Sequence, residues 1–164
     1  MSIDPLRLPL RALMMPLQRL RRLIWAVKPR SVVGAHAVAL TPEGKILLVK
    51  LRYARGWHVP GGVRKAGETA RQNALRELTE ETGMLSYGSI VQLLDEVELV
   101  NHRSDASGVF LVRDIIYRPR WTLEVEEIVE ADFDALPADT SPRARRWIET
   151  ARLQLTIAAT NQAT

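Results

Sequence analysis

The sequence GETARQNALRELTEETG, residues 67–83, has the composition of a helix that ends at a glycine. Its last two turns contain Glu77, Glu80 and Glu81, at positions i, i+3 and i+4. At about 100° per residue, these three carboxylates share one arc of the helix roughly 100° wide. Like charges at such offsets destabilise a helix by about 0.2–0.5 kcal/mol per pair, and the helix dipole disfavours anions at this end. The pattern therefore needs a compensating partner.

A hard divalent cation would be such a partner, because Mg²⁺ prefers oxygen ligands and is often shared between a few carboxylates and substrate phosphates. Arg76 precedes Glu80 by four residues, so its guanidinium can orient that carboxylate and keep it ionised. Upstream, the glycines at 61 and 62 leave a backbone without Cβ atoms, which a metal or phosphate can approach closely. The alternative interpretation is an acidic, solvated helix face.

The longer spacing decides against a solvated face. Residues 62–84 match the pattern G-x5-E-x7-R-E-U-x-E-E-x-G-U, with U apolar, at every specified position, from Gly62 and Glu68 to Gly83 and Met84. This pattern is the Nudix box, and the sequence resembles the Nudix hydrolase family. The resemblance extends more loosely over residues 32–152, and residues 1–30 lie outside it.

The resemblance implies an α/β fold, a Nudix-type α/β/α sandwich with a mixed β-sheet between helices. It also implies hydrolysis of a nucleoside diphosphate linked to another moiety, by a water activated with Mg²⁺ or Mn²⁺. By position, Arg76 would orient the catalytic glutamates and Glu68 would be structural. Glu80 would be a third metal ligand or a proton acceptor. The metal ligands implied by position are the Gly61 carbonyl, Glu77, Glu80 and Glu81.

The general base is less clearly implied, because family members take it from the box or from a distant loop. Glu127 matches a position that often faces the site, although it could equally be an exposed acid. Asp95, Glu96 and Glu98 are weaker candidates. We expect substrate contacts from residues near the box, with packing or solvation as the alternative for each: Tyr53, Trp57 and His58.

Subfamily features that are absent narrow the substrate. About sixteen residues after the box, ADP-ribose hydrolases often carry a proline and diadenosine polyphosphate hydrolases a tyrosine; neither residue occurs between Tyr87 and Tyr117, and the coenzyme A signature is missing. Without cysteine, the zinc ribbon of NADH pyrophosphatases cannot form. A nucleoside triphosphate or related small nucleotide remains as the expected substrate. Two alternatives stay open: a catalytically silent nucleotide-binding module, and a membrane-surface protein acting on another pyrophosphate.

Composition favours one globular domain, which we place at residues 31–155, with a flexible tail at 156–164. The chain has 164 residues, 46% hydrophobic and 26% charged, and its lack of cysteine fits a cytoplasmic location. No apolar run approaches the roughly 18 residues of a membrane span. The sequence leaves a homodimer open.

The first 30 residues differ from the rest. Seven basic residues against Asp4 alone give this segment a charge of +6, so the remainder carries −2 of the net +4. Because the net positive charge of the chain comes from this segment, it gives no support for specific nucleic-acid binding by the domain. An apolar stripe, formed by Leu17, Leu20, Ile24 and Val27, predicts an amphipathic helix. That helix could dock on the domain or lie on an anionic membrane surface, and a disordered or transit-like tail is the third alternative.

Hydrophobic patterning predicts the remaining elements. We expect a polar turn at 101–107, a loop at 54–62 and a last helix with Pro142 at its first position. The predicted strands are residues 32–40, 46–51, 89–100 and 108–118, and the predicted helices are residues 68–82 and 142–153.

Overall fold

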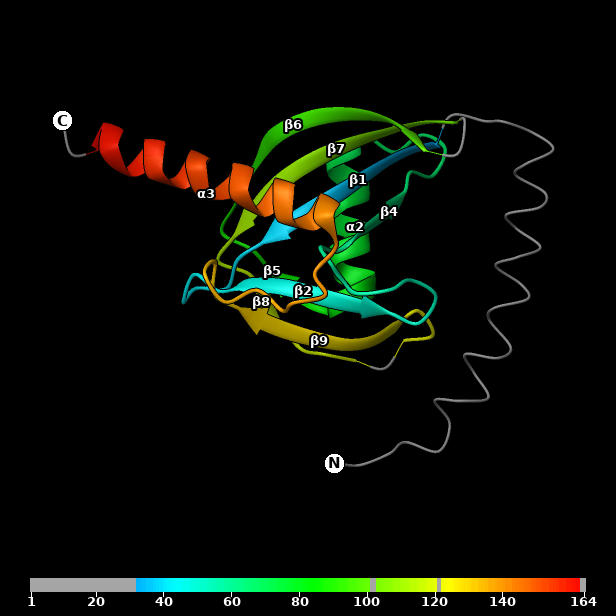
Figure 1. Cartoon of the computed structure of the whole chain (residues 1–164), viewed down its shortest axis with the longest axis horizontal. Helices are drawn as coiled ribbons and strands as arrows, with labels where there is room; N and C mark the ends of the chain where they lie inside the picture. The colour runs from blue at the N-terminus through cyan, green and yellow to red at the C-terminus, as the bar shows by residue number, and fades with distance from the viewer. Residues whose placement is uncertain (1–31, 101–102, 121, 163–164) are drawn as a thin grey trace.

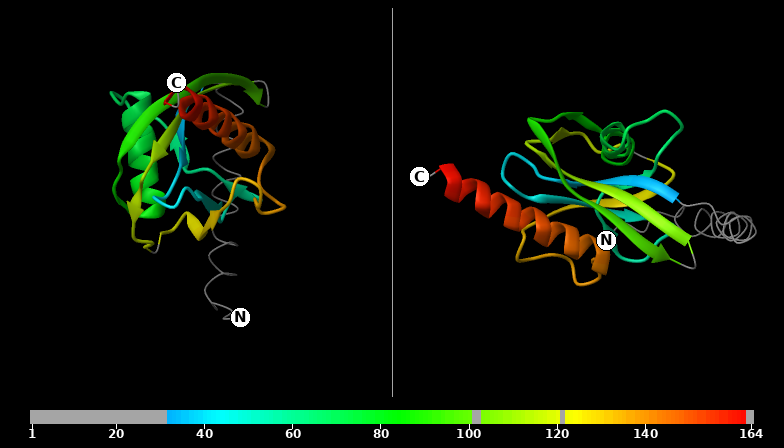
Figure 2. Two further views of the ribbon diagram at one scale, coloured as in Figure 1. Left: turned by 90° about the vertical axis from the view of Figure 1, so that its left-hand side faces the viewer. Right: turned by 90° about the horizontal axis from the view of Figure 1, so that it is seen from above.

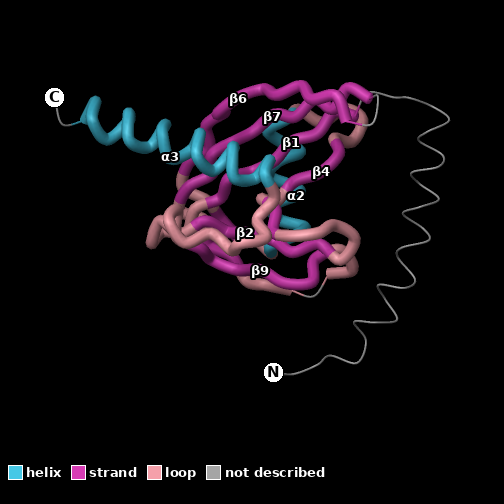
Figure 3. The backbone as a smooth tube through the Cα atoms, viewed as in Figure 1, coloured by secondary structure: helices cyan, strands magenta, loops and turns pink. Residues whose placement is uncertain are grey.

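The computed structural model describes residues 32–100, 103–120 and 122–162, which form nine strands and two helices (Figures 1 and 3). The two helices are α2 (Ala70–Thr82) and α3 (Pro142–Gln162). Neither described helix combines the length and hydropathy that a membrane span requires. The strands are β1 (Val32–Ala39), β2 (Ile46–Leu51), β3 (Trp57–His58), β4 (Gly61–Val63), β5 (Met84–Ser86), β6 (Ser89–Val100), β7 (Arg103–Arg113), β8 (Ile116–Tyr117) and β9 (Val125–Ala131).

The main sheet has four strands in the order β4-β1-β7-β6. Strands β1 and β7 are parallel, with His36 opposite Val109, whereas β4 and β6 pair antiparallel with their neighbours. A second sheet has the order β3-β2-β9, and β5 pairs with β8. The sheet is therefore mixed, as the resemblance implied, and β4 lies at its edge.

The sheet is buried on both faces because successive side chains of each strand point to opposite sides. On β1, Ala35 and Ala37 pack against Leu78 of α2, whereas Val38 packs in a cluster with Trp147 and other residues of α3. The two helices accordingly lie on opposite sides of the strands (Figure 2). This arrangement confirms the predicted α/β/α sandwich.

Helix α2 begins and ends at residues with clear capping roles. Thr69 and Gln72 form a capping box, in which each side chain accepts a hydrogen bond from the other's backbone N–H. At the other end, Gly83 has φ 75°, a left-handed conformation that glycine adopts without a Cβ penalty, and its N–H bonds the Thr79 carbonyl. The predicted helix is confirmed, with its first turn starting at Ala70 rather than residue 68.

Strand β7 and helix α3 have other bounds than the sequence predicts. Strand β7 starts at Arg103, because its ladder with β6 continues through most of the stretch expected as a turn. It stops at Arg113 because Asp114 has φ 56°, which breaks the extended backbone, so the predicted strand at 108–118 divides into β7 and β8. Helix α3 continues past Leu155 to Gln162, since no glycine or proline follows Pro142. The flexibility expected of residues 156–164 stays a prediction.

Strand β9 was not predicted, because three glutamates mask its buried positions Val125 and Ala131. The loop expected at 54–62 contains the short strands β3 and β4. The amphipathic helix expected in residues 1–30 lies outside the described residues.

Candidate active site

The edge strand β4 presents its backbone to the last turn of α2. Ala37 N–H bonds the Pro60 carbonyl, and Arg64 N–H bonds the Val33 carbonyl. In an antiparallel ladder with this register, the N–H and C=O of Gly61 point away from β1. The Gly61 N–H donates to Oε2 of Glu81 at 2.9 Å. The carbonyl expected as a metal ligand therefore lies on the same open edge as Glu81.

Glu81 is a buried acid, with only 4% of its surface exposed. Burial raises the pKa of Glu81 to about 8, against the lowering effect of the Gly61 hydrogen bond, and the nearby charges of Glu77, Glu124 and Glu80 raise it further. The charged neighbours named here are all acids, so a positive charge bound beside Glu81 would stabilise its ionised form.

Glu77 lies one turn earlier in a narrow slot. A Cβ added at Gly62 would lie 2.6 Å from Oε1 of Glu77, so any larger residue would displace this carboxylate from its position. Burial raises the pKa of Glu77, and the ion pair with Arg76, 3.0 Å from Nη1 to Oε1, acts in the opposite direction. The partly buried Glu77 and the buried Glu81 are thus neighbouring carboxylates on one side of α2.

Arg76 links the acidic residues of the box. Its Nε donates to Glu68 at 2.6 Å and its Nη1 to Glu80 at 2.8 Å, in addition to the contact with Glu77. The Glu68 hydrogen bond is the largest contribution that raises the pKa of Arg76, and the same contact lowers the pKa of Glu68. Glu80 is half exposed and also pairs with Lys65 at 3.4 Å.

Glu124 is a member of the site that sequence reasoning missed. It immediately precedes β9, where its carbonyl accepts the Arg52 N–H, and its charge raises the pKa of both Glu77 and Glu81. Glu127, the expected base, is exposed and lies opposite Lys50 in the β2–β9 ladder. Glu124 comes close to Glu77 and Glu81 because β2 pairs with β9. The sequence alone contains no signal for this pairing of distant segments.

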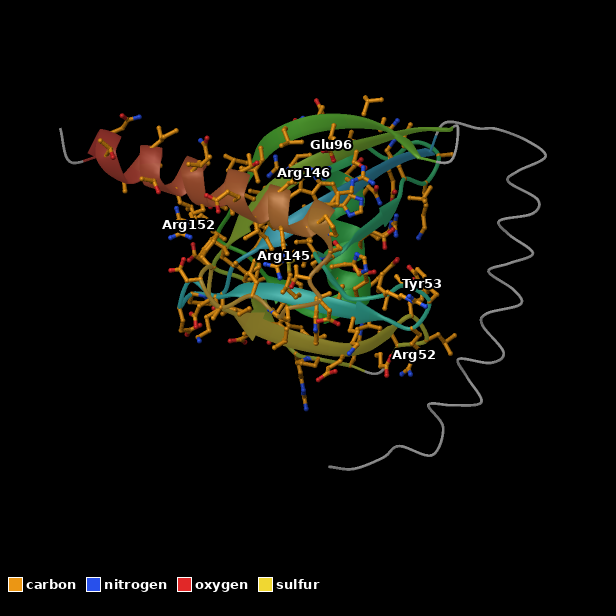
Figure 4. All side chains as sticks on the ribbon, in the orientation of Figure 1. Arg52, Tyr53, Glu96, Arg145, Arg146 and Arg152 are labelled. Carbon is orange, nitrogen blue, oxygen red and sulfur yellow. The ribbon has the colours of Figure 1, made fainter. Side chains whose placement is uncertain are left out.

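The expected substrate-binding residues occupy three different environments. Trp57 is buried in the core cluster shared with α3, with the Lys50 ammonium 5.4 Å from its ring centre. Tyr53, labelled in Figure 4, is half-buried in the loop after β2 and packs against the small apolar cluster that contains Val125. Nε2 of His58 lies 2.9 Å from the Arg55 carbonyl. Tyr53 and His58 retain exposed surface, whereas Trp57 serves packing.

Two of the weaker acidic candidates on β6, Asp95 and Glu96, lie apart from Glu77 and Glu81. Glu96 accepts hydrogen bonds from Arg146 at 3.0 Å and from the Trp147 indole at 3.0 Å, and Figure 4 shows it beside Arg146. Asp95 lies near Gly108 on the α2 side of the sheet. The Glu98 side chain lies outside the described part of the chain.

Glu77 and Glu81 could supply part of the coordination shell of a divalent cation. Among the described residues, no three acidic or histidine side chains surround a common point. The chemistry of the donor set is nevertheless suitable, because Glu77 is a partly buried and Glu81 a buried carboxylate, and both have raised pKa values. Mg²⁺ is typically held by one or two carboxylates, with waters and substrate phosphates as the other ligands.

The sequence comparison agrees with this geometry. The family described as the NUDIX domain matches residues 30–163. This chain belongs to the NUDIX domain family. The resemblance drawn from residues 62–84 is therefore confirmed.

Known NUDIX structures share the fold. The chain is similar to the MutT NUDIX hydrolase from Burkholderia pseudomallei, at 25% identity and a TM-score of 0.63 over 74% of this chain and 98% of that one. A NUDIX hydrolase from Nitrosomonas europaea matches with a TM-score of 0.65 at 22% identity, over 76% of this chain and 90% of that one.

A curated relative matches a shorter segment. A Bacillus subtilis protein named "Putative 8-oxo-dGTP diphosphatase" is 44% identical over 50 residues, which are 30% of this chain. The matched segment spans 34% of the length of that relative.

Proposed function

We propose that this NUDIX protein hydrolyses a pyrophosphate bond in a nucleoside diphosphate linked to another moiety, with Mg²⁺ or Mn²⁺ as cofactor. The observation that carries the proposal is the pair of carboxylates beside the glycine backbone of β4, formed by the partly buried Glu77 and the buried Glu81. Two acids with raised pKa values at a backbone free of Cβ atoms suit a cation and a phosphate together.

The residues of the box would have separate roles. Glu77, Glu81 and the Gly61 carbonyl would hold the cation, with Glu80 as a further ligand. A bound divalent cation supplies a water of lowered pKa and neutralises charge on the phosphate oxygens. Arg76 would keep Glu77 and Glu80 in fixed positions through its ion pairs.

A proton acceptor is needed near the attacked phosphate. Three glutamates are available: Glu80, which is half exposed; Glu124, whose charge reaches both buried acids; and Glu127, three residues further along the same segment. We favour Glu80 or Glu124, because each acts electrostatically on Glu77 and Glu81.

We propose a nucleoside triphosphate or related small nucleotide as the substrate. Support comes from the missing subfamily signatures and from the similarity to the Bacillus subtilis protein named for 8-oxo-dGTP. Tyr53 and His58 have the exposure needed to contact a base or phosphate, and Trp57 would support the loop that carries them. A cytoplasmic location, membrane contact through residues 1–30 and a homodimer stay predictions.

A screen of nucleotide pyrophosphates with Mg²⁺ and with Mn²⁺ tests this proposal. The readout is released phosphate, pyrophosphate or nucleoside monophosphate, compared with Glu81→Gln under the same conditions. Metal-dependent turnover of at least one nucleotide, lost in the variant, is expected. Nucleotide binding without turnover of any compound would favour the catalytically silent module instead.

A further inference from the structure

Asn73 is a polar residue at a fully buried position, where an apolar residue would pack more favourably. It lies on α2 between the helix and the sheet, with no exposed surface, next to the buried Ala74. Its Oδ1 is buried and has no hydrogen-bond partner among the described residues. An unpaired buried acceptor costs free energy, and alanine has the higher helix propensity. Stability alone therefore does not account for an asparagine here.

The other end of the Asn73 amide faces the site. Its Nδ2 lies 3.4 Å from the Val63 carbonyl on β4 and 3.5 Å from Oε1 of Glu77, one turn further along the helix. Both neighbours are acceptors, so only the orientation that points the amide nitrogen toward them is favourable. The amide accordingly joins the edge strand, the helix and Glu77.

The two oxygens of Glu77 are in different situations. Oε1 lies 3.0 Å from Nη1 of Arg76 and 3.5 Å from the Asn73 amide nitrogen, whereas neither of these two contacts involves Oε2. Both oxygens lie against Gly62, where an added Cβ would be 2.6 Å from Oε1 and 3.1 Å from Oε2. The carboxylate is therefore held through one oxygen, and the second is left for another ligand.

We propose that Asn73 is a positioning residue that, together with Arg76, fixes Oε1 of Glu77 so that Oε2 is presented to the divalent cation. This inference rests on the metal-dependent function proposed above. Outer partners of metal ligands typically change metal affinity by 10–100-fold when they are removed. Both Asn73 contacts are long for hydrogen bonds, so we expect an effect at the lower end of that range.

Mn²⁺ binding to the full chain, measured by titration calorimetry without nucleotide, tests the proposal. We expect Asn73→Ala to weaken Mn²⁺ binding by about tenfold, which corresponds to about 1.4 kcal/mol, with little change in melting temperature. The matched control is Gln72→Ala on the same helix. It removes half of the capping box, so it should lower the melting temperature while leaving the Mn²⁺ affinity unchanged. Wild-type Mn²⁺ affinity in Asn73→Ala would overturn the inference.

A double-mutant cycle separates positioning from general packing. If Asn73 acts through Glu77, Asn73→Ala should have no further effect on residual Mn²⁺ binding in a Glu77→Gln background. Additive losses would contradict the inference. Should Asn73→Ala fail to fold, Asn73→Leu fills the site without a donor, and the same tenfold loss is expected.

Glu81→Gln distinguishes this inference from the function on which it rests. If the wild-type protein binds no Mn²⁺, or Glu81→Gln binds it as tightly as the wild type, the proposed metal site is wrong. If Glu81→Gln loses binding and Asn73→Ala keeps it, only the role of Asn73 is wrong.

Discussion

The Gly61 N–H donates a hydrogen bond of 2.9 Å to Oε2 of Glu81, which joins the edge strand β4 to the last turn of α2. Glu81 is thereby fixed by the sheet as well as by its own helix. The contact is possible because Gly61 occupies a position whose backbone groups point away from β1. It places Glu81, the most buried acid among the described side chains, next to the glycine backbone that a phosphate can approach closely.

Replacing Glu81 by Gln should abolish most activity while preserving the fold. The variant keeps the shape and the hydrogen bond from Gly61 but lacks the charge that would hold a cation. We expect kcat/KM to fall at least about 100-fold, a loss of roughly 2.7 kcal/mol of transition-state stabilisation. Exposed Glu149 on α3 provides a control, and Glu149→Gln should retain wild-type kinetics. Near wild-type turnover of Glu81→Gln at saturating Mg²⁺ would contradict the assignment.

The stability of the metal-free protein should depend on pH through Glu81. Its pKa is about 8 in the folded protein and near the ordinary 4.5 when unfolded, so the folded state binds the proton more tightly. This contribution is fully present below about pH 4.5 and is lost as the pH rises toward 8, by at most about 1.4 kcal/mol per pH unit. Chemical denaturation at several pH values should therefore show that the wild type loses free energy of unfolding relative to Glu81→Gln as the pH rises. Parallel curves for the two proteins would show that Glu81 keeps an ordinary pKa.

Arg76→Lys should impair catalysis although it conserves the charge. One ammonium cannot reproduce the forked contacts that Arg76 makes with Glu68, Glu77 and Glu80. We expect kcat/KM to fall at least about tenfold, that is by about 1.4 kcal/mol. Arg71 is exposed on the same helix, and Arg71→Lys should behave as wild type. Equal kinetics of the two variants would mean that Arg76 does not orient the glutamates.

Removal of residues 1–30 should leave the chemistry intact. The described site draws on β4, α2 and the segment before β9, and the basic N-terminal segment is not needed for any contact reported above. A chain starting at Ser31 should keep most turnover on a nucleotide free in solution, and it should lose any binding to anionic vesicles in flotation. A truncated protein that folds by circular dichroism but binds no Mg²⁺ would place the N-terminal segment in the site.

Local signals explain what could be predicted from sequence. Thr69 and Gly83 delimit α2 through capping, which depends on residues within one turn. Strands β2 and β6 have the predicted bounds because their apolar residues form clear runs. The box itself places Glu77, Glu80 and Glu81 on one helix, so their proximity follows from helical spacing alone.

Contacts between distant segments explain what could not be predicted. Glu124 reaches the site because the end of β2 pairs with the segment before β9, as the Arg52 N–H to Glu124 carbonyl bond shows. The fixed position of Glu81 likewise depends on the register of β4 against β1. Neither register can be read from hydrophobic patterning, because the glutamates of β9 obscure its period and β4 has only three residues.

The melting temperature with and without Mg²⁺ tests most directly whether Glu77 and Glu81 hold the metal. A ligand that binds only the folded protein at about 100 times its Kd stabilises it by roughly 2.7 kcal/mol, enough to raise the melting temperature by several degrees. We predict this rise for wild type and for Glu68→Gln, since Glu68 contacts Arg76 rather than the buried pair. We predict its loss in Glu77→Gln combined with Glu81→Gln. General screening by salt would act on all these carboxylates alike. An equal rise in wild type and in the Glu77/Glu81 double variant would contradict the account.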